Sequence, residues 1–129
     1  MYHLDTNIVI AYLNGNQTIA AKLKLNLPEV SISSLVLAEL LYGARASGRS
    51  AANLEKLRQF LQIVSVADFE AASADAYSHI RLDLKLKGRP TGEADMLIAA
   101  IAISNNAILV THNTKHFGNI EGLRFEDWL

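Results

Sequence analysis

Short apolar segments alternate with longer ones along the whole chain, and this alternation limits the fold more than any other feature. The short segments are bounded by polar or turn residues, as buried strands are, whereas the longer ones have helical spacing. We expect strands at residues 2–4, 30–33, 63–66, 107–110 and 123–125, and helices at residues 7–13, 18–25, 35–44, 51–61, 69–87 and 94–104. Successive strands joined by helices usually run parallel. The sequence therefore predicts an α/β fold with a mainly parallel central sheet flanked by helices.

Polar residues that follow the expected strands mark the expected helix starts. Thr6, Ser34 and Asp68 each precede a helical segment, where a side-chain oxygen can accept a hydrogen bond from a free backbone N–H group. One segment is ambiguous, because at residues 80–86 every second residue is Ile or Leu, which is the spacing of a strand. Its position inside a longer helical segment favours a helix.

Length and composition limit the class of protein. A chain of 129 residues suits a single domain over residues 1–129, and one that is 50% hydrophobic and 19% charged can bury a core. The net charge is −1, so the chain lacks the strong positive charge typical of nucleic-acid-binding domains. Contact with RNA must then come from a local basic patch or through a metal ion. The absence of cysteine excludes disulfides, thiol catalysis and zinc ribbons.

The N-terminal residues have no basic stretch followed by an apolar one, so they do not resemble a signal peptide. No apolar run reaches the length of about 18 residues that a membrane span needs. We therefore expect a cytoplasmic protein with no membrane partner.

Three carboxylates stand in apolar surroundings. Asp5 ends the first expected strand, Glu39 lies inside the run Leu35–Leu41, and Asp95 precedes the run Met96–Ile103. An ionised carboxylate is costly to remove from water unless it is paired or binds a metal ion, and no basic residue adjoins these three in sequence. Clustering around Mg²⁺ or Mn²⁺, which prefer oxygen ligands, would satisfy all three acids. Residues 111–113 also follow a strand and can reach the same crevice at the carboxyl ends of the strands.

Each acid also has a simpler structural explanation. Asp5 can cap the first helix, and Asp95 can interact with the dipole at the start of its own helix. Glu39 is harder to explain in this way, because its helical segment has no polar face. A shared metal site accounts for all three acids together.

The same residues carry a resemblance to the PIN-domain ribonucleases. Leu4-Asp5-Thr6-Asn7 resembles the opening motif of that family, and Ser33 to Ala44 resembles its glutamate helix. Gly92 to Ala100 is similar to the third motif and Leu109 to Phe117 to the fourth. The ending, Ile120 to Trp128, resembles the tail of VapC-type toxins in particular. The likeness spans nearly the whole chain, with the motifs in the right order.

The resemblance implies a PIN-like fold, a divalent-metal-dependent ribonuclease activity, a homodimer and inhibition by a VapB-type antitoxin. Asp5, Glu39 and Asp95 match the acidic centre of the family. Asn113 falls at the fourth position, where many relatives have an acid, and His116 also falls where relatives often have an acid. The number of metal ions, one or two, stays open.

We therefore expect the toxin component of a type II toxin–antitoxin system, an endoribonuclease that requires Mg²⁺ and accepts Mn²⁺. Asp5 and Asp95 are the expected principal metal ligands, and Glu39 is expected to bind the metal through water or to orient the attacking water. Thr6, Thr111 and Asn113 are expected to be polar supports for waters or for the scissile phosphate. Glu93 is either a further outer acid or a solvated residue of a first helical turn.

Two other classes of function remain open. A zinc hydrolase could use His112 and His116, whose spacing suits one helix face, together with His3 or His79. However, the sequence around the first two histidines is typical of a loop. A PIN fold without catalysis that only binds RNA or protein is the other alternative.

The densest basic stretch is the expected contact for RNA. It comprises Arg81, Lys85, Lys87 and Arg89, joined by Arg45 and Arg49, although a solvated helix face explains these side chains equally well. The likeness to VapC toxins makes a tRNA one expected substrate.

Overall fold

A computed structural model describes residues 1–129 and contains one five-stranded sheet in which every strand is parallel to its neighbours. The strand order is β3-β2-β1-β4-β5. The strands are β1 (Tyr2–Leu4), β2 (Val30–Ser33), β3 (Ser65–Ala67), β4 (Ile108–Val110) and β5 (Phe125–Glu126). The prediction of an α/β fold with a parallel central sheet is confirmed.

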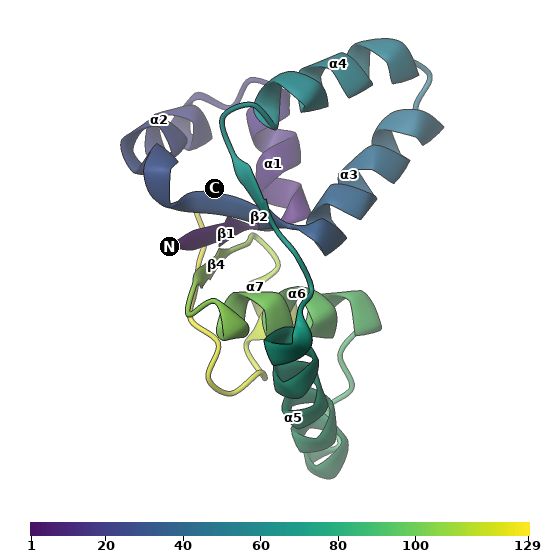
Figure 1. The fold of residues 1–129 in the computed structure, drawn as a ribbon, viewed down its shortest axis with the longest axis vertical. Helices are drawn as coiled ribbons and strands as arrows, with labels where there is room; N and C mark the ends of the chain where they lie inside the picture. The colour runs from purple at the N-terminus through teal and green to yellow at the C-terminus, as the bar shows by residue number, and fades with distance from the viewer.

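Helices cover both faces of this sheet (Figure 1). The helices are α1 (Thr6–Leu13), α2 (Gln17–Asn26), the 3-10 helix η1 (Leu27–Glu29), α3 (Ser34–Ala46), α4 (Ser50–Phe60), α5 (Ala71–Lys87), α6 (Glu93–Ser104) and α7 (Thr114–Phe117). Helices α1 to α4 lie on one side of the strands, and α5 to α7 lie on the other.

Helix α6 is the most deeply buried helix. Ala99, Ala100, Ile101 and Ala102 have no exposed surface. A helix that is apolar all round belongs in a core, and its small alanines allow close approach to its neighbours. The strands supply the other side of the core, with Leu4, Ile32 and Leu109 fully buried.

The strand order reverses direction at β1. From β1 the chain first builds outward through β2 and β3, and then returns to place β4 on the other side of β1. Ligands of open α/β sheets bind at such a switch point, in the crevice beyond the carboxyl ends of the strands. Asp5 and Thr111, which directly follow β1 and β4, lie at this point.

The three expected helix caps differ in the structure, while the other helix starts lie within one residue of the prediction. The N-cap of α1 is Asp5 rather than Thr6, because Asp5 accepts the hydrogen bond from the Thr6 N–H group while the Thr6 hydroxyl bonds elsewhere. The N-cap of α3 is Ser33 rather than Ser34, since the Ser33 hydroxyl accepts from the Val36 N–H group. Helix α5 begins after Glu70, not after Asp68.

Two strands and one helix also differ from the sequence prediction. Strand β3 is shifted towards Ala67 because it pairs with β2 in that register, which keeps the chain extended beyond the expected end. Strand β5 lies at Phe125–Glu126, two residues later than the start we expected. Residues 114–117 form a short helix where a loop was expected, because a single turn is too short to show helical periodicity.

The ambiguous segment at residues 80–86 belongs to helix α5. Ile80 and Leu84 are buried on one face, whereas Leu82 and Leu86 are exposed on another. The helix ends at Gly88, which has a φ of 65° in the left-handed region that favours glycine. The apparent strand pattern therefore combines the core face of a helix with an apolar outer face.

No helix in the structure combines the length and the apolar character that crossing a membrane would require.

The side chain of His3 is buried in the centre of the sheet, and neither of its ring nitrogens has a hydrogen-bond partner. Burial, with a smaller contribution from the positively charged amino terminus, lowers the pKa of His3 from 6.5 to about 4. The folded protein therefore holds this ring in its neutral form at neutral pH.

This burial predicts a loss of stability in acid. Between pH 6.5 and 4 the unfolded chain binds a proton at His3 that the folded chain does not. The free energy of unfolding therefore decreases as the pH is lowered through this range. We expect His3 to contribute a loss of about 2 kcal/mol between pH 7 and pH 5. Urea unfolding at both pH values should show a smaller loss in His3→Leu than in the wild type. A loss of the same size in both proteins would contradict this account; His79→Leu, at an exposed position, is the matched control.

Candidate active site

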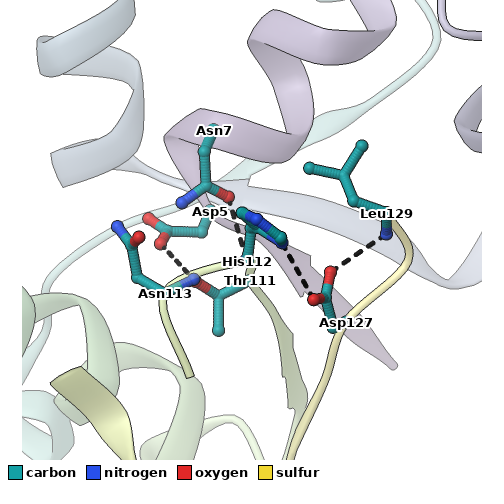
Figure 2. A network of polar contacts seen from close by, with 7 residues as sticks. All are labelled: Asp5, Asn7, Thr111, His112, Asn113, Asp127 and Leu129. Carbon is teal, nitrogen blue, oxygen red and sulfur yellow. Dashed lines mark hydrogen bonds and ion pairs between the residues drawn. The ribbon is translucent and has the colours of Figure 1, made fainter. Parts of the chain in front are cut away.

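Asp5 is held at the end of β1 by bonds to both neighbouring elements. Its N–H group donates to the Val110 carbonyl at 2.8 Å, which extends the pairing between β1 and β4. Its Oδ1 accepts from the Thr6 N–H group at 2.9 Å. Its Oδ2 accepts from the Thr111 hydroxyl at 2.8 Å, a bond that Figure 2 shows. The residue is 5% exposed. Asp5 is therefore a fixed, nearly dry carboxylate at the switch point.

The pKa of Asp5 is raised above its ordinary value of 3.8, mainly because burial disfavours the charged form. The hydrogen bonds from Thr111 and Thr6 and the nearby His116 oppose this rise, whereas the negative charge of Asp95 adds to it. Asp5 and Asp95 thus interact electrostatically, which places both acids in one site. A bound cation would favour the ionised form of both.

Asp95 enters the site from the first turn of α6 and is partly exposed. Its Oδ2 lies 3.3 Å from Nδ1 of His116, which α7 supplies. A basic side chain therefore does accompany Asp95, contrary to what the sequence neighbourhood indicated. The ring of His116 is 61% exposed, so this contact is of the weak, solvent-screened kind.

Glu39 is exposed, and the expectation that it is a buried acid is wrong. Only the stripe Val36, Leu40 and Ala44 of α3 is buried, so Glu39 lies at the edge of an open groove rather than in the core. Its Oε1 accepts a hydrogen bond from the Thr6 hydroxyl at 2.9 Å. Since Thr6 adjoins Asp5, this bond holds the glutamate near the other two acids.

The loop after β4 supplies the remaining polar groups. Thr111 is fully buried, and its hydroxyl oxygen accepts from the Asn113 N–H group at 3.0 Å while donating to Asp5. The side chain of Asn113 makes no capping hydrogen bond to α7. Figure 2 shows its amide pointing to the same side of the loop as the Asp5 carboxylate. The amide oxygen is thus available to a ligand.

The oxygen donors at this site are of the kind that Mg²⁺ and Mn²⁺ prefer, and the pKa of Asp5 is raised mainly by burial and to a smaller extent by the charge of Asp95. As they stand, no three carboxylate or histidine side chains converge closely enough to form a complete metal cage. Asp5 and Asp95 interact electrostatically at the centre of the site, and Glu39 is held at its edge by Thr6. The residues present fit a hard divalent cation held with water among its ligands.

The four histidines are not gathered into one site. His3 lies inside the sheet, and His79 lies on α5 with Asp75 at 3.7 Å. His112 and His116 contact different acids, Asp127 and Asp95, and His112 lies outside the short helix that contains His116. The geometry therefore does not favour the zinc-hydrolase alternative.

Glu93 accepts a hydrogen bond from the Tyr77 hydroxyl at 3.2 Å, so its side chain is attached to α5.

In the basic stretch, Lys87 is paired with Asp83 at 2.9 Å. The remaining residues of the stretch, Arg81, Lys85 and Arg89, line one hollow beside Met96 of α6. Arg45 and Arg49 do not join them, because they lie at the far end of α3 and the start of α4, well away from α5 in Figure 1.

Two residues of the site network were missed by the sequence reasoning. Asn7 accepts a hydrogen bond from the His112 N–H group at 3.1 Å, and Asp127 contacts the His112 ring at 2.9 Å. Asn7 stood inside the Leu-Asp-Thr-Asn motif, which was a usable signal. Asp127 stood inside the VapC-like ending, but nothing in the sequence linked it to His112, which lies 15 residues away across a strand pairing.

A buried aspartate at a switch point, with a second acid from a nearby helix, is the arrangement expected of the PIN family. The sequence model of the PIN domain family matches residues 2–123. The chain therefore belongs to the PIN domain family, and the resemblance stated from its motifs is confirmed.

Within that family the chain is similar to VapC proteins. It is 40% identical to the tRNA(fMet)-specific endonuclease VapC of Shigella flexneri, with 98% of this chain and 97% of the relative covered. It is 39% identical to ribonuclease VapC2 of Rickettsia felis, with 99% and 98% covered.

Solved structures show the same likeness. VapBC2 from Rickettsia felis bound to a DNA fragment from their promoter superposes with a TM-score of 0.94 at 39% identity, with 99% of this chain and 98% of that chain covered. DNA-bound VapBC from Salmonella typhimurium gives a TM-score of 0.95 at 36% identity, with 99% and 98% covered. The expected PIN-like fold is thus confirmed.

The raised pKa of Asp5 predicts that this residue destabilises the metal-free protein. A carboxyl whose pKa is raised by folding contributes stability below pH 3.8, and this stability is lost as the pH rises through the folded pKa. At pH 7 the ionised form is therefore unfavourable, and Asp5→Asn should raise the unfolding temperature in EDTA by a few degrees. Scanning calorimetry checks this against Asp75→Asn, at a position that is 79% exposed. An unfolding temperature that Asp5→Asn leaves unchanged or lowers would contradict the prediction that the ionised Asp5 destabilises the metal-free protein.

Proposed function

We propose that this protein is a metal-dependent endoribonuclease and the toxin of a VapBC-type toxin–antitoxin pair. The observation that carries the proposal is the buried carboxylate of Asp5 at the switch point of a PIN fold. The negative charge of Asp95 contributes to the raised pKa of this carboxylate. The VapC relatives, which are named ribonucleases or endonucleases, support the same class of reaction.

Asp5 and Asp95 would hold a Mg²⁺ ion, and Mn²⁺ would substitute for it because it accepts the same oxygen ligands. Asn113 would add a neutral amide oxygen. Glu39, at the edge of the site, would reach the ion through water. A second ion would join only with the substrate, whose phosphate supplies further oxygen ligands.

A bound divalent ion supplies charge neutralisation at the phosphate and lowers the pKa of water. The protein side chains provide the geometry for hydrolysis. Glu39 is exposed and held by Thr6, so its free oxygen can accept a hydrogen bond from the attacking water and orient it. Thr111 keeps the Asp5 carboxylate in one orientation, and the Asn113 amide can donate to a phosphate oxygen. Thr6 and Thr111 thus act as supports.

RNA would reach this site along the basic hollow that α5 and α6 form. Arg81, Lys85 and Arg89 line a space of about 400 Å³ that also includes Met96, the residue after Asp95. Arginines and lysines at such a place bind phosphates of the RNA backbone. By analogy with the relative from Shigella flexneri, a tRNA is the proposed substrate.

A VapB-type antitoxin would occupy the groove beside Glu39. This groove, of about 230 Å³, is formed by α1, α3 and α4, with Ile10, Leu13, Leu40 and Gly43 in its lining. Its apolar walls suit the apolar face of an amphipathic segment. A basic side chain of that segment could continue to Asp5 and Asp95, neutralise them and exclude the cation.

We also propose that two copies form a homodimer and that the protein acts in the cytoplasm, where its RNA substrate is found. Leu82 and Leu86 on the outer face of α5 are 55% and 76% exposed, so a single copy leaves apolar surface uncovered. Light scattering after size-exclusion chromatography measures this association directly.

Cleavage of total RNA by the purified protein should stop in EDTA and return with Mg²⁺ or Mn²⁺ but not with Zn²⁺, because the proposed ligands are all oxygens. Asp5→Ala, Glu39→Ala and Asp95→Ala should each reduce cleavage by about 100-fold or more and abolish growth inhibition. Asp75→Asn is the matched control. Calorimetric titration with Mn²⁺ should show weaker binding in Asp95→Ala, independently of activity.

Full cleavage in excess chelator would rule out a metal-dependent reaction. A folded Asp95→Ala protein with wild-type toxicity would rule out the site. Mn²⁺ binding without any cleavage of RNA would favour the alternative of a PIN fold that only binds its partner.

The antitoxin groove can be blocked at Gly43, which lies one helical turn after Glu39, without replacing any of the acids. A Cβ atom at Gly43 would meet no atom within 4 Å, so a larger side chain there fits the fold and fills the groove. Gly43→Trp should weaken binding of a co-expressed VapB-type antitoxin by about tenfold or more and leave RNA cleavage intact.

Gly43→Ala, which adds a single methyl group, and Gly48→Trp, at another open position outside the groove, are the controls. Antitoxin affinity that Gly43→Trp leaves at the wild-type value would move the docking site elsewhere.

A further inference from the structure

The last residues of the chain are attached to the loop that carries Thr111, His112 and Asn113. Strand β5 pairs with β4, and the Thr111 N–H group donates to the Glu126 carbonyl at 2.9 Å. Two residues later Trp128 is buried, with its ring 5.4 Å from that of Tyr2 on β1. Asp127 lies between these two anchors, so its position relative to the loop is defined.

Asp127 makes the one side-chain contact from the tail to this loop. Its Oδ2 lies 2.9 Å from Nδ1 of His112, and its Oδ1 accepts from the Leu129 N–H group at 3.0 Å (Figure 2). An ionised carboxylate can only accept, so the His112 ring carries its hydrogen on Nδ1 in this contact. The Leu129 N–H group, and less strongly His112, lower the pKa of Asp127, which favours that ionised state.

The loop is held at four points, of which one is Asp5, one is helix α1 and two are in the C-terminal tail. The Thr111 hydroxyl donates to Asp5, the Thr111 N–H group to the tail, and the His112 N–H group to Asn7 of α1. The Asp127 contact is the fourth. Removing Asp127 leaves the backbone pairing of β5 with Thr111 in place but frees the His112 side chain.

We propose that Asp127 is a positioning residue that acts through His112 to hold the Thr111–Asn113 loop against Asp5. This inference rests on the proposed ribonuclease function. The physical reason is rigidity: His112 lies between the residue that orients Asp5 and the residue whose amide faces the site. Without the Asp127 contact the His112 side chain is free, and the Asn113 amide next to it can take several orientations, only some of which suit the reaction.

The inference predicts a specific kinetic effect. Asp127→Ala should lower kcat for cleavage of an in vitro transcribed tRNA(fMet), or of total RNA if that tRNA is not cut, by roughly tenfold. KM should change little, because the basic hollow is untouched. Glu126→Ala is the matched control, since Glu126 is adjacent and exposed and serves the loop only through its backbone.

Two further measurements separate positioning from a general loss of stability. Hydrogen exchange of the His112 and Asn113 amides should be faster in Asp127→Ala than in Glu126→Ala, without RNA or metal present. In a double-mutant cycle, Asp127→Ala should have no further effect on kcat once His112→Ala is present. His112→Ala, at a side chain that is 60% exposed, reports on the same contact if Asp127→Ala does not fold.

Failure of the positioning role of Asp127 can be distinguished from failure of the proposed ribonuclease function. Wild-type kcat and wild-type exchange in Asp127→Ala would overturn the positioning role and leave the ribonuclease intact. Additive effects of the two substitutions would also overturn it, because Asp127 would then act independently of His112. If the wild-type protein cut no RNA with Mg²⁺, the ribonuclease proposal would fail, and hydrogen exchange alone would decide whether Asp127 holds the loop.

Discussion

The carboxylate of Asp5, kept out of water where the sheet reverses its strand order, is the constraint on which the site depends. The rest of the site satisfies or balances this one charge. The backbone of Thr6 and the hydroxyl of Thr111 bind its two oxygens, and the latter bond joins the first strand of the chain to a loop more than a hundred residues later. Asp95 adds a second negative charge that raises the pKa of Asp5 further. Such a site is unfavourable for folding and favourable for a cation.

Parallel pairing explains how distant segments meet at Asp5. Because β1 and β4 are adjacent and run in the same direction, their carboxyl ends and the loops that follow them come together without any contact between neighbours in sequence. Helix α6 brings Asp95 from one face of the sheet, and α3 brings Glu39 from the other (Figure 1). The groove of α1, α3 and α4 includes Glu39 in its lining. The proposed antitoxin groove and the proposed active site therefore share this one acid.

The sequence predicted most of the fold, because alternating strands and helices determine a parallel sheet and the apolar spacing of each element is local. The prediction was less accurate where a position depends on a partner far away. Strand β3 moved to the register that β2 imposes. Glu39 was expected to be buried because its neighbours in sequence are apolar, but those neighbours line a groove that only the packing of three helices creates. Asp5 and Asp95 could be recognised by residue type and motif, whereas the contact between Asp127 and His112 exists only in three dimensions.

The alanines of α6 have a consequence for how this protein tolerates mutation. Ala99, Ala100 and Ala102 have no exposed surface, so the distance between α6 and its neighbours is set by single methyl groups. A larger residue at any of them would force the helix outward, at a typical cost of about 1–3 kcal/mol. Asp95 is carried on the first turn of that helix and would move with it, away from Asp5. Spontaneous variants that have lost toxicity should therefore include conservative apolar exchanges deep in the core, far from any charged residue.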